Sequence, residues 1–189
     1  MEGRLWQKCD KQLKYLALTR WPNVLMTVTT QLVIIYGYLP QTNAVLALNT
    51  WQIALLVTAT ALVTASGNVI NDIYDVATDQ INKPDQVIVG KKLTEKKALT
   101  FYIILSSIAI IAGFLLANSL DKTGLSGLFI AVSFVLFLYA TQLKRILLVG
   151  NLIISFLVAL VVIITAVFEL FPAINELNKS MQLQVLMHL

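Results

Sequence analysis

The segment Asn71-Asp72-Ile73-Tyr74-Asp75-Val76-Ala77-Thr78-Asp79 (NDIYDVATD) follows directly on twenty residues, 51–70, that carry no charged side chain. About 20 apolar residues in a helix are enough to cross the roughly 30 Å hydrocarbon core of a bilayer. The segment therefore marks the point at which a predicted membrane-spanning helix meets water.

The composition of the whole chain agrees with a membrane location. Of its 189 residues, 58% are hydrophobic and 13% are charged, whereas a soluble domain has about 45–50% apolar and about 25% charged residues. The mean hydropathy is +0.78. A water-soluble globule of this size could not bury so much apolar surface. One cysteine and one histidine also exclude a disulfide framework and a histidine metal cluster.

The apolar runs predict one all-α domain over residues 1–189, a polytopic transmembrane helical bundle. Five runs are long enough to span the membrane: residues 21–39, 51–70, 99–118, 123–141 and 146–168. A sixth run begins at residues 181–189 but contains only nine residues.

The distribution of positive charge predicts the topology. If the spans alternate in direction, twelve Lys and Arg residues lie on one side and two on the other. The positive-inside rule then places the N-terminus and the Asp-rich segment in the cytoplasm, in a protein of the cell inner membrane. Asp121, Glu169 and Glu176 are expected to be surface charges on the outer side. The scattered basic residues form no stripe that would favour nucleic acid as a partner.

The polar side chains around the Asp-rich segment share one face of a continuous helix. At 100° per residue, an arc of about 100° contains all of them. They are Asn68, Asn71, Asp72, Asp75, Asp79 and Asn82.

Carboxylates that are this close repel one another unless a cation joins them. Mg²⁺ suits such a site, because it is commonly held by one or two carboxylates together with the phosphates of a substrate. Basic residues that could contact a diphosphate follow on the predicted cytoplasmic side: Lys83, Lys91, Lys92, Lys144 and Arg145. The alternative is a solvated acidic helix end, with Lys144 and Arg145 as topology determinants only.

These residues resemble the UbiA superfamily of intramembrane prenyltransferases, whose first Asp-rich motif is NDxxDxxxD. The resemblance extends to Arg20-x-x-Asn23, to Tyr139-Ala-Thr-Gln-Leu-Lys144-Arg145 and to Gly150-Asn151. It implies Mg²⁺-dependent transfer of a polyprenyl group from its diphosphate to an acceptor. The motif is most similar to the branch that transfers geranylgeranyl to geranylgeranylglycerol phosphate.

The resemblance also implies roles for individual residues, within a membrane that supplies the lipid surroundings. Asp72, Asp75 and Asp79 are expected to be catalytic, and Asn71, Asp75 and Asp79 to hold Mg²⁺. Substrate contacts are expected from Arg20, Asn23, Lys83, Tyr139, Lys144 and Arg145.

Other functions remain open at this stage. The acceptor could be aromatic, as in quinone or chlorophyll-type enzymes, or the chain could be a non-catalytic membrane remnant. An ion-coupled transporter is disfavoured, because the acids gather at one predicted helix end rather than at mid-bilayer. The family has a second Asp-rich motif after its sixth helix, and no acidic residue follows Glu176 here. We therefore expect the N-terminal portion of a longer protein, with little or no transferase activity alone.

Overall fold

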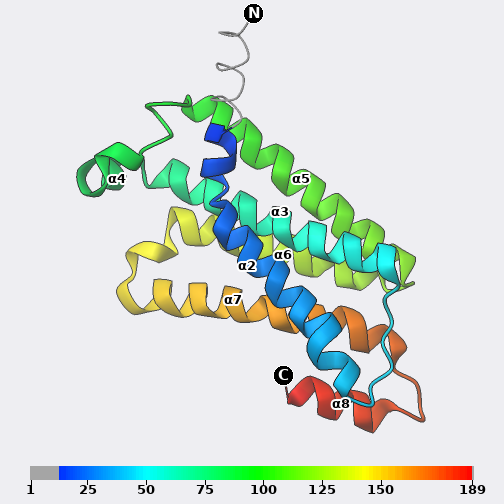
Figure 1. The fold of residues 1–189 in the computed structure, drawn as a ribbon. Coiled ribbons are helices and arrows are strands. Elements are labelled where there is room, and N and C mark those ends of the chain that lie inside the picture. The colour runs from blue at the N-terminus through cyan, green and yellow to red at the C-terminus, as the bar shows by residue number, and fades with distance from the viewer. Residues whose placement is uncertain (1–12, 189) are drawn as a thin grey trace, which may run out of the picture.

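Helices follow one another along residues 13–188, which are the residues that the computed structural model describes (Figure 1). Residues 13–18 are helical. The long α-helices are α2 (Trp21–Leu32), α3 (Thr50–Tyr74), α5 (Glu95–Ser119), α6 (Ser126–Thr141) and α7 (Leu147–Leu170). The short ones are α4 (Val76–Asn82) and α8 (Lys179–Met187). Single turns connect them: η2 (Leu39–Gln41), η3 (Pro84–Gln86), η4 (Thr123–Leu125), η5 (Leu143–Arg145) and η6 (Phe171–Ala173).

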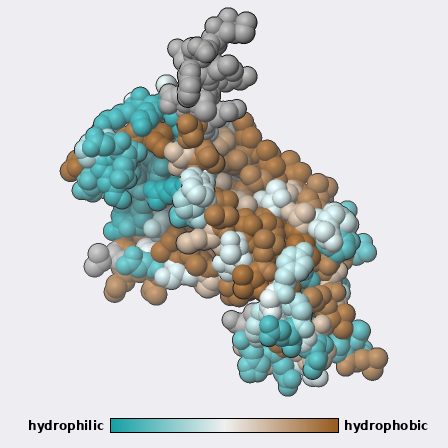
Figure 2. All heavy atoms as spheres, in the orientation of Figure 1, coloured by the Kyte–Doolittle hydropathy of each residue, from teal (hydrophilic) through white to brown (hydrophobic). Residues whose placement is uncertain are grey.

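The described helices form a polytopic membrane bundle, as the composition predicts. Four segments are long and apolar enough to cross a bilayer: Thr50–Tyr74, Glu95–Ser119, Thr123–Thr141 and Leu148–Ala173. Figure 2 shows hydrophobic surface over the middle of the molecule and hydrophilic surface at two ends, one over α4 and the other near α8. An apolar belt between two polar caps is the surface that a bilayer requires.

The first predicted span, residues 21–39, is not one regular α-helix. Helix α2 ends at Leu32, and the chain continues as a π-helix, η1 (Val33–Tyr38), before η2. For this reason the segment is absent from the four long apolar helices among the described residues, and the number of five spans stays a prediction. Pro22 stands in the first turn of α2, where its missing N–H leaves no partner unsatisfied.

Helix α3 lies at the centre of the bundle and packs against α2, α5 and α6. Its first turn is closed by a capping box, in which the Asn49 side chain accepts from the Gln52 N–H and the Gln52 side chain accepts from the Asn49 N–H. Helices α5 and α6 meet closely at Gly113, where any Cβ atom would overlap the ring of Phe129. That ring is buried against Phe168 of α7, with 5.7 Å between the centroids.

A buried polar contact joins three helices. Gln31 of α2 accepts a hydrogen bond from the Thr60 hydroxyl of α3 at 2.6 Å and donates to the Thr165 hydroxyl of α7 at 3.1 Å. All three side chains are buried, and none of their polar atoms lacks a partner. In a membrane interior such a satisfied network fixes the positions of the helices along one another.

The expectation that Glu169 is a surface charge is wrong. Its side chain is only 1% exposed, and it accepts a hydrogen bond from the Leu48 N–H at 3.2 Å. The extended segment before α3 folds over the end of α7 and needs an acceptor for its backbone. The Gln182 side chain of α8 similarly donates to the Val45 carbonyl at 2.8 Å.

Two sequence-based expectations concern chain ends that extend beyond the described residues. The N-terminal segment expected in the cytoplasm includes residues 1–12, and the run 181–189 includes Leu189; these thirteen residues lie outside the described part.

Candidate functional site

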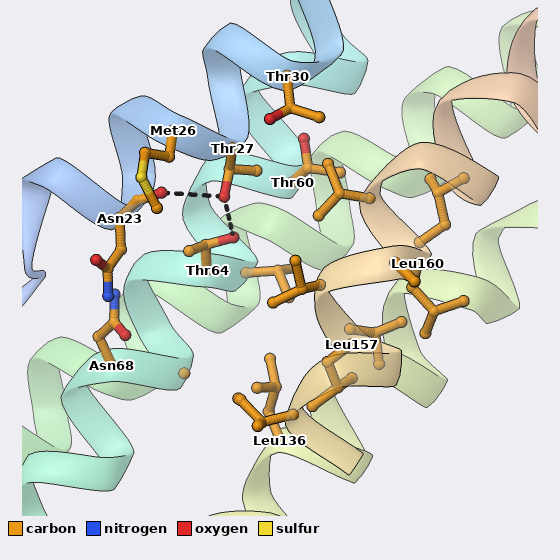
Figure 3. Close-up of a pocket in the computed structure, with 18 of the residues that line it drawn as sticks. Asn23, Met26, Thr27, Thr30, Thr60, Thr64, Asn68, Leu136, Leu157 and Leu160 are labelled. Carbon is orange, nitrogen blue, oxygen red and sulfur yellow. Dashed lines mark hydrogen bonds between the residues drawn. The ribbon is translucent and has the colours of Figure 1, made fainter. Parts of the chain in front are cut away.

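A cavity of about 660 Å³ lies between α2, α3, α6 and α7 (Figure 3). Its lining includes five of the residues singled out from the sequence: Arg20, Asn23, Asn68, Asn71 and Tyr139. Most of the remaining lining is apolar and comes from α6 and α7. The volume falls in the range of about 300–1,000 Å³ that is usual for small-molecule sites.

The Asp-rich segment does not continue as one helix. Helix α3 ends at Tyr74, and Asp75 separates it from α4 with φ −95° and ψ 0°. The expectation that Asp79 and Asn82 share one helical face with Asn71 is therefore wrong beyond this residue. Asp is suited to such a break, because its short side chain bonds to nearby groups in non-helical conformations; here the Asp75 carboxylate accepts from the Asn71 amide at 2.7 Å.

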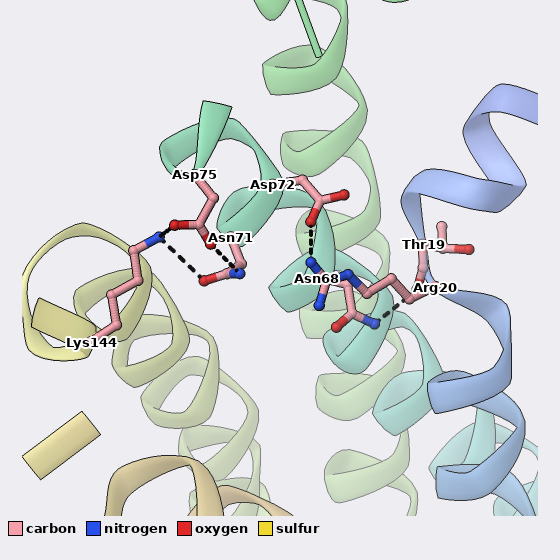
Figure 4. Close-up of polar contacts among 7 residues, drawn as sticks. All are labelled: Thr19, Arg20, Asn68, Asn71, Asp72, Asp75 and Lys144. Carbon is pink, nitrogen blue, oxygen red and sulfur yellow. Dashed lines mark hydrogen bonds and ion pairs between the residues drawn. The ribbon is translucent and has the colours of Figure 1, made fainter. Parts of the chain in front are cut away.

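Lys144 brings a positive charge to this break (Figure 4). Its ammonium group donates to Oδ1 of Asp75 at 2.7 Å and to Oδ1 of Asn71 at 3.4 Å. The side chains are 14% exposed for Lys144 and 23% for Asp75. An ion pair with this little solvent is screened less than one on the surface. Because Oδ1 of Asp75 and Oδ1 of Asn71 both contact the ammonium group, we call these two atoms the cation-binding pair.

The position of Lys144 depends on the turn η5 and on Gly150 in the first turns of α7. A Cβ atom at Gly150 would lie 3.1 Å from the Lys144 Cα and 3.3 Å from the Leu143 carbonyl oxygen. Contacts of this length are tighter than most that Cβ atoms make, so a glycine favours the close approach of the turn to α7. Gly150, the first residue of the Gly150-Asn151 motif, thus helps to place the lysine.

A second ion pair lies on the other side of α3. Nη2 of Arg20 is 2.6 Å from Oδ1 of Asp72, and the Arg20 side chain is 45% exposed. Arg20 has φ 49° and ψ 58°, in the left-handed region that residues with a Cβ atom rarely occupy. The Asn68 amide donates to the neighbouring Thr19 carbonyl at 2.8 Å and thereby ties this turn to α3.

The three carboxylates of the motif are therefore divided. Asp72 pairs with Arg20, Asp75 pairs with Lys144, and Asp79 lies in α4 beyond the break. Among residues 13–188, no three His, Cys, Asp or Glu side chains gather closely enough to hold a metal ion together.

A magnesium ion is nevertheless compatible with the donors present. Asn71 and Asp75 are hard oxygen ligands that already converge on one cation, the Lys144 ammonium. Mg²⁺ needs only one or two carboxylates from the protein when phosphates supply further oxygens. The assignment of Asn71, Asp75 and Asp79 as metal ligands stays a prediction.

Lys83 and Arg145 do not join the paired residues. Lys83 caps the end of α4 and Arg145 ends η5, and both side chains are exposed. Their expected contact with substrate also stays a prediction.

Sequence reasoning missed the hydroxyl groups of the cavity. Thr27, Thr30, Thr60 and Thr64 line it together with Asn23 and Asn68. The signal was present in the spacing, because residues three or four apart lie on the same face of a helix. It was hidden because threonine is common in apolar helices and carries no charge.

Known proteins resemble this chain in sequence and in fold. Residues 20–183 match the UbiA prenyltransferase family. Digeranylgeranylglyceryl phosphate synthase of Methanococcoides burtonii is 35% identical over 146 residues, which are 76% of this chain and 50% of the relative. The enzyme of the same name from Methanothrix thermoacetophila is 37% identical over 103 residues, 54% of this chain and 37% of the relative.

A solved structure of a digeranylgeranylglyceryl phosphate synthase in membranes superimposes with a TM-score of 0.69 and 26% identity, covering 84% of this chain and 53% of that chain. The chain thus spans about half the length, or less, of these relatives.

Proposed function

This chain belongs to the UbiA prenyltransferase family, and on that basis we propose that it takes part in Mg²⁺-dependent transfer of a geranylgeranyl group from its diphosphate to geranylgeranylglyceryl phosphate. The names of the relatives support this acceptor, because a digeranylgeranylglyceryl phosphate carries two geranylgeranyl groups on one glyceryl phosphate. A synthase of that product must add the second group to a molecule that already has the first.

The observation that carries the proposal is the cation-binding pair at one end of the cavity. Asn71 belongs both to the cavity lining and to the contact with Asp75 and Lys144. A diphosphate at this place meets a carboxylate that can share a metal ion with it and an ammonium group that can bond to it directly. The apolar lining behind Asn71 is suited to a prenyl chain.

The chemistry follows from this arrangement. In the transfer, the allylic C–O bond to the diphosphate breaks, a bond forms between that carbon and the acceptor hydroxyl oxygen, and the hydroxyl proton leaves with the freed diphosphate. Asn71, Asp75 and Asp79 would hold the Mg²⁺ ion, which would supply positive charge to balance the charge that grows on the leaving group. Lys144 and Arg20 add fixed donors beside it, and the apolar lining keeps water away from the electron-poor carbon.

The remaining site residues take the roles that the sequence suggested. We assign Asn71, Asp75 and Asp79 to the metal, with Asp72 supporting through Arg20. Lys144, Arg20, Asn23 and Tyr139 contact substrate from the cavity or its end. Lys83 and Arg145, both exposed, meet the diphosphate only if α4 or η5 moves toward it.

The orientation in the membrane is part of the proposal. The break at Asp75 and the turn with Lys144 lie at one end of the bundle. We place this end in the cytoplasm, because twelve of the fourteen Lys and Arg residues are expected on that side. The membrane is then the inner membrane of the cell.

Binding of geranylgeranyl diphosphate tests the proposal directly. Calorimetry on the detergent-solubilised chain, with and without Mg²⁺, compares the parent with an Asp75→Asn/Asp79→Asn variant. The control is Asp85→Asn/Asp121→Asn, which makes the same change in charge at two exposed positions. We expect Mg²⁺-dependent binding in the parent and the control, and its loss in the first variant. No binding in the parent, or equal binding in all three, contradicts the proposal.

A further inference from the structure

The cavity has two chemically different walls. Asn23, Thr27 and Thr30 of α2 and Thr60, Thr64 and Asn68 of α3 form one wall, which we call the polar seam. Phe129, Val132 and Leu136 of α6 and Leu157, Val158 and Val161 of α7 form the apolar wall. Figure 3 shows the labelled members of the polar seam on the two neighbouring helices, with Leu136, Leu157 and Leu160 lying apart from them.

The polar seam extends from the diphosphate end deep into the bundle. Spacings of four and three residues on α2, and of four and four on α3, keep its members on one face of each helix. The last member of the seam on α3, Thr60, lies eleven residues from Asn71 at the diphosphate end, or roughly 16 Å at 1.5 Å per residue. Polar groups at this depth in a membrane are costly unless something bonds to them.

The deepest member of the seam is already satisfied. Thr60 donates to Gln31 at 2.6 Å and belongs to the buried contact among α2, α3 and α7. This contact closes the seam at the end that lies farthest from Asn71. The groups available to a ligand therefore lie between Asn71 and Thr60.

Those available groups can both donate and accept hydrogen bonds. The Thr27 hydroxyl gives its proton to the Asn23 carbonyl at 3.1 Å, so its oxygen can accept. Its distance to the Thr64 hydroxyl is 3.4 Å, at the outer limit for a hydrogen bond. The Asn23 amide has no hydrogen-bond partner within residues 13–188. In Figure 3 it faces the side chain of Asn68.

The two substrates of the proposed function differ in polarity behind their phosphate groups, and the two walls of the cavity differ in polarity as well. Behind its diphosphate, the donor has only a hydrocarbon chain. Behind its phosphate, the acceptor has a glycerol unit with a free hydroxyl and an ether oxygen. A hydrocarbon chain against the polar seam would leave the amides and hydroxyls of the seam without partners, which costs free energy. The oxygen atoms of a glycerol unit can form hydrogen bonds with these groups.

We propose that the polar seam binds the glycerol unit of the acceptor and that the apolar wall receives the geranylgeranyl chain of the donor. This inference rests on the proposed function and adds to it the position of each substrate. The acceptor lies against α2 and α3, and the donor chain lies against α6 and α7. Thr27 and Thr64 are then residues that determine specificity for an oxygen-bearing acceptor.

Paired variants of nearly equal shape test the positions. Thr27→Val/Thr64→Val removes two seam hydroxyls, and Val132→Thr/Val158→Thr adds two to the apolar wall. The matched control is Thr29→Val/Thr58→Val, at two exposed positions on the same helices that do not line the cavity. The probes are geranylgeranylglyceryl phosphate, its analogue with CH₂ in place of the ether oxygen, and geranylgeranyl diphosphate with Mg²⁺, each measured by calorimetry on the detergent-solubilised chain.

The seam variant is expected to bind the acceptor about tenfold more weakly, since each lost hydrogen bond is worth roughly three- to tenfold. Its affinity for the donor should stay within twofold of the parent, which also shows that the variant is folded. The preference of the parent for the ether over its CH₂ analogue should disappear in the seam variant. The apolar-wall variant should show the reverse, with weaker donor binding and unchanged acceptor binding.

The possible failures can be told apart. If the parent binds both substrates and the seam variant binds the acceptor as the parent does, the positions are wrong and the proposed function stands. Equal weakening of donor and acceptor in the seam variant also contradicts the separation of the walls. A parent that binds no donor contradicts the proposed function itself and this inference with it.

Discussion

The ammonium group of Lys144 lies 2.7 Å from Oδ1 of Asp75, although 69 positions separate the two residues in the chain. The contact holds the turn before α7 against the break between α3 and α4. It also means that a carboxylate assigned to the metal is already paired with the positive charge of a lysine. A divalent cation must therefore compete with a lysine for Asp75.

Removal of this lysine should change the affinity for the metal ion and the affinity for the diphosphate in opposite directions. For Lys144→Met we expect Mn²⁺, used as a spectroscopic substitute for Mg²⁺, to bind about three- to tenfold more tightly, because no ammonium group competes for the carboxylate. Geranylgeranyl diphosphate should bind about tenfold more weakly, since a charge-assisted hydrogen bond is lost. Electron paramagnetic resonance measures the first and calorimetry the second.

Lys122→Met is the control for this change, because Lys122 is an exposed lysine before η4. It should leave both affinities unaltered. Weaker Mn²⁺ binding in Lys144→Met would mean that the lysine assists the metal rather than competing with it.

Gly150→Ala should weaken diphosphate binding without touching a ligand. The new methyl group would lie 3.1 Å from the Lys144 Cα, so the turn has to move and the ammonium group moves with it. We expect a loss on the order of fivefold in affinity for geranylgeranyl diphosphate, since small displacements of a positioning group have large effects. Calorimetry with Mg²⁺ present gives the measurement.

The matched variant is Gly127→Ala in α6, where a Cβ atom meets nothing within 4 Å. It should bind as the parent does and be at least as stable, because alanine is the better helix former. Equal binding by the two alanine variants would contradict the role given to Gly150.

Two substitutions of Arg20 separate its backbone from its side chain. Both Arg20→Ala and Arg20→Gly remove the ion pair with Asp72, but only glycine adopts φ 49° without strain. We expect the glycine variant to be more stable than the alanine variant by about 1–2 kcal/mol. Thermal unfolding in one detergent compares them. If alanine is equally stable, the turn changes its conformation once the guanidinium is gone.

Gln31→Leu should destabilise the bundle although the two side chains have similar size. It leaves the buried Thr60 and Thr165 without the amide that bonds to both. Loss of buried hydrogen bonds costs about 1–3 kcal/mol, which a lower unfolding temperature reports. Gln80→Leu, at an exposed position of α4, is the control. A Gln31 variant as stable as this control would show that the contact among the three helices is dispensable.

The long helices could be predicted from sequence because the thickness of a bilayer sets their length. The predicted runs 51–70, 99–118, 123–141 and 146–168 fall within helices Thr50–Tyr74, Glu95–Ser119, Thr123–Thr141 and Leu147–Leu170, apart from Ile146 at one end. The apolar side chains are sufficient for this inference, because only the interior of a bilayer accommodates helices that expose so many of them.

The details of the site could not be predicted in the same way. A helical wheel places residues on one assumed helix, and it cannot reveal that Asp75 ends α3 or that Arg20 and Lys144 pair with different carboxylates. Glu169 was misplaced for a similar reason. Its charge indicated a position in water, but the side chain is buried and accepts a hydrogen bond from the backbone N–H of Leu48 before α3. These contacts depend on packing between elements that are far apart in the chain.

The π-helix at Val33–Tyr38 leaves this part of the chain tolerant of a change in its length. The hydrogen-bonded turn of a π-helix contains one residue more than that of an α-helix. Deletion of one residue here would restore a regular α-helix and leave Gln31, which precedes it, in register with α3 and α7. The same deletion within α3 would turn the Asp-rich end by about 100° relative to its capping box. A one-residue deletion within Val33–Tyr38 should therefore preserve the contact of Gln31 with Thr60 and Thr165, whereas the same deletion within α3 should misplace the Asp-rich end.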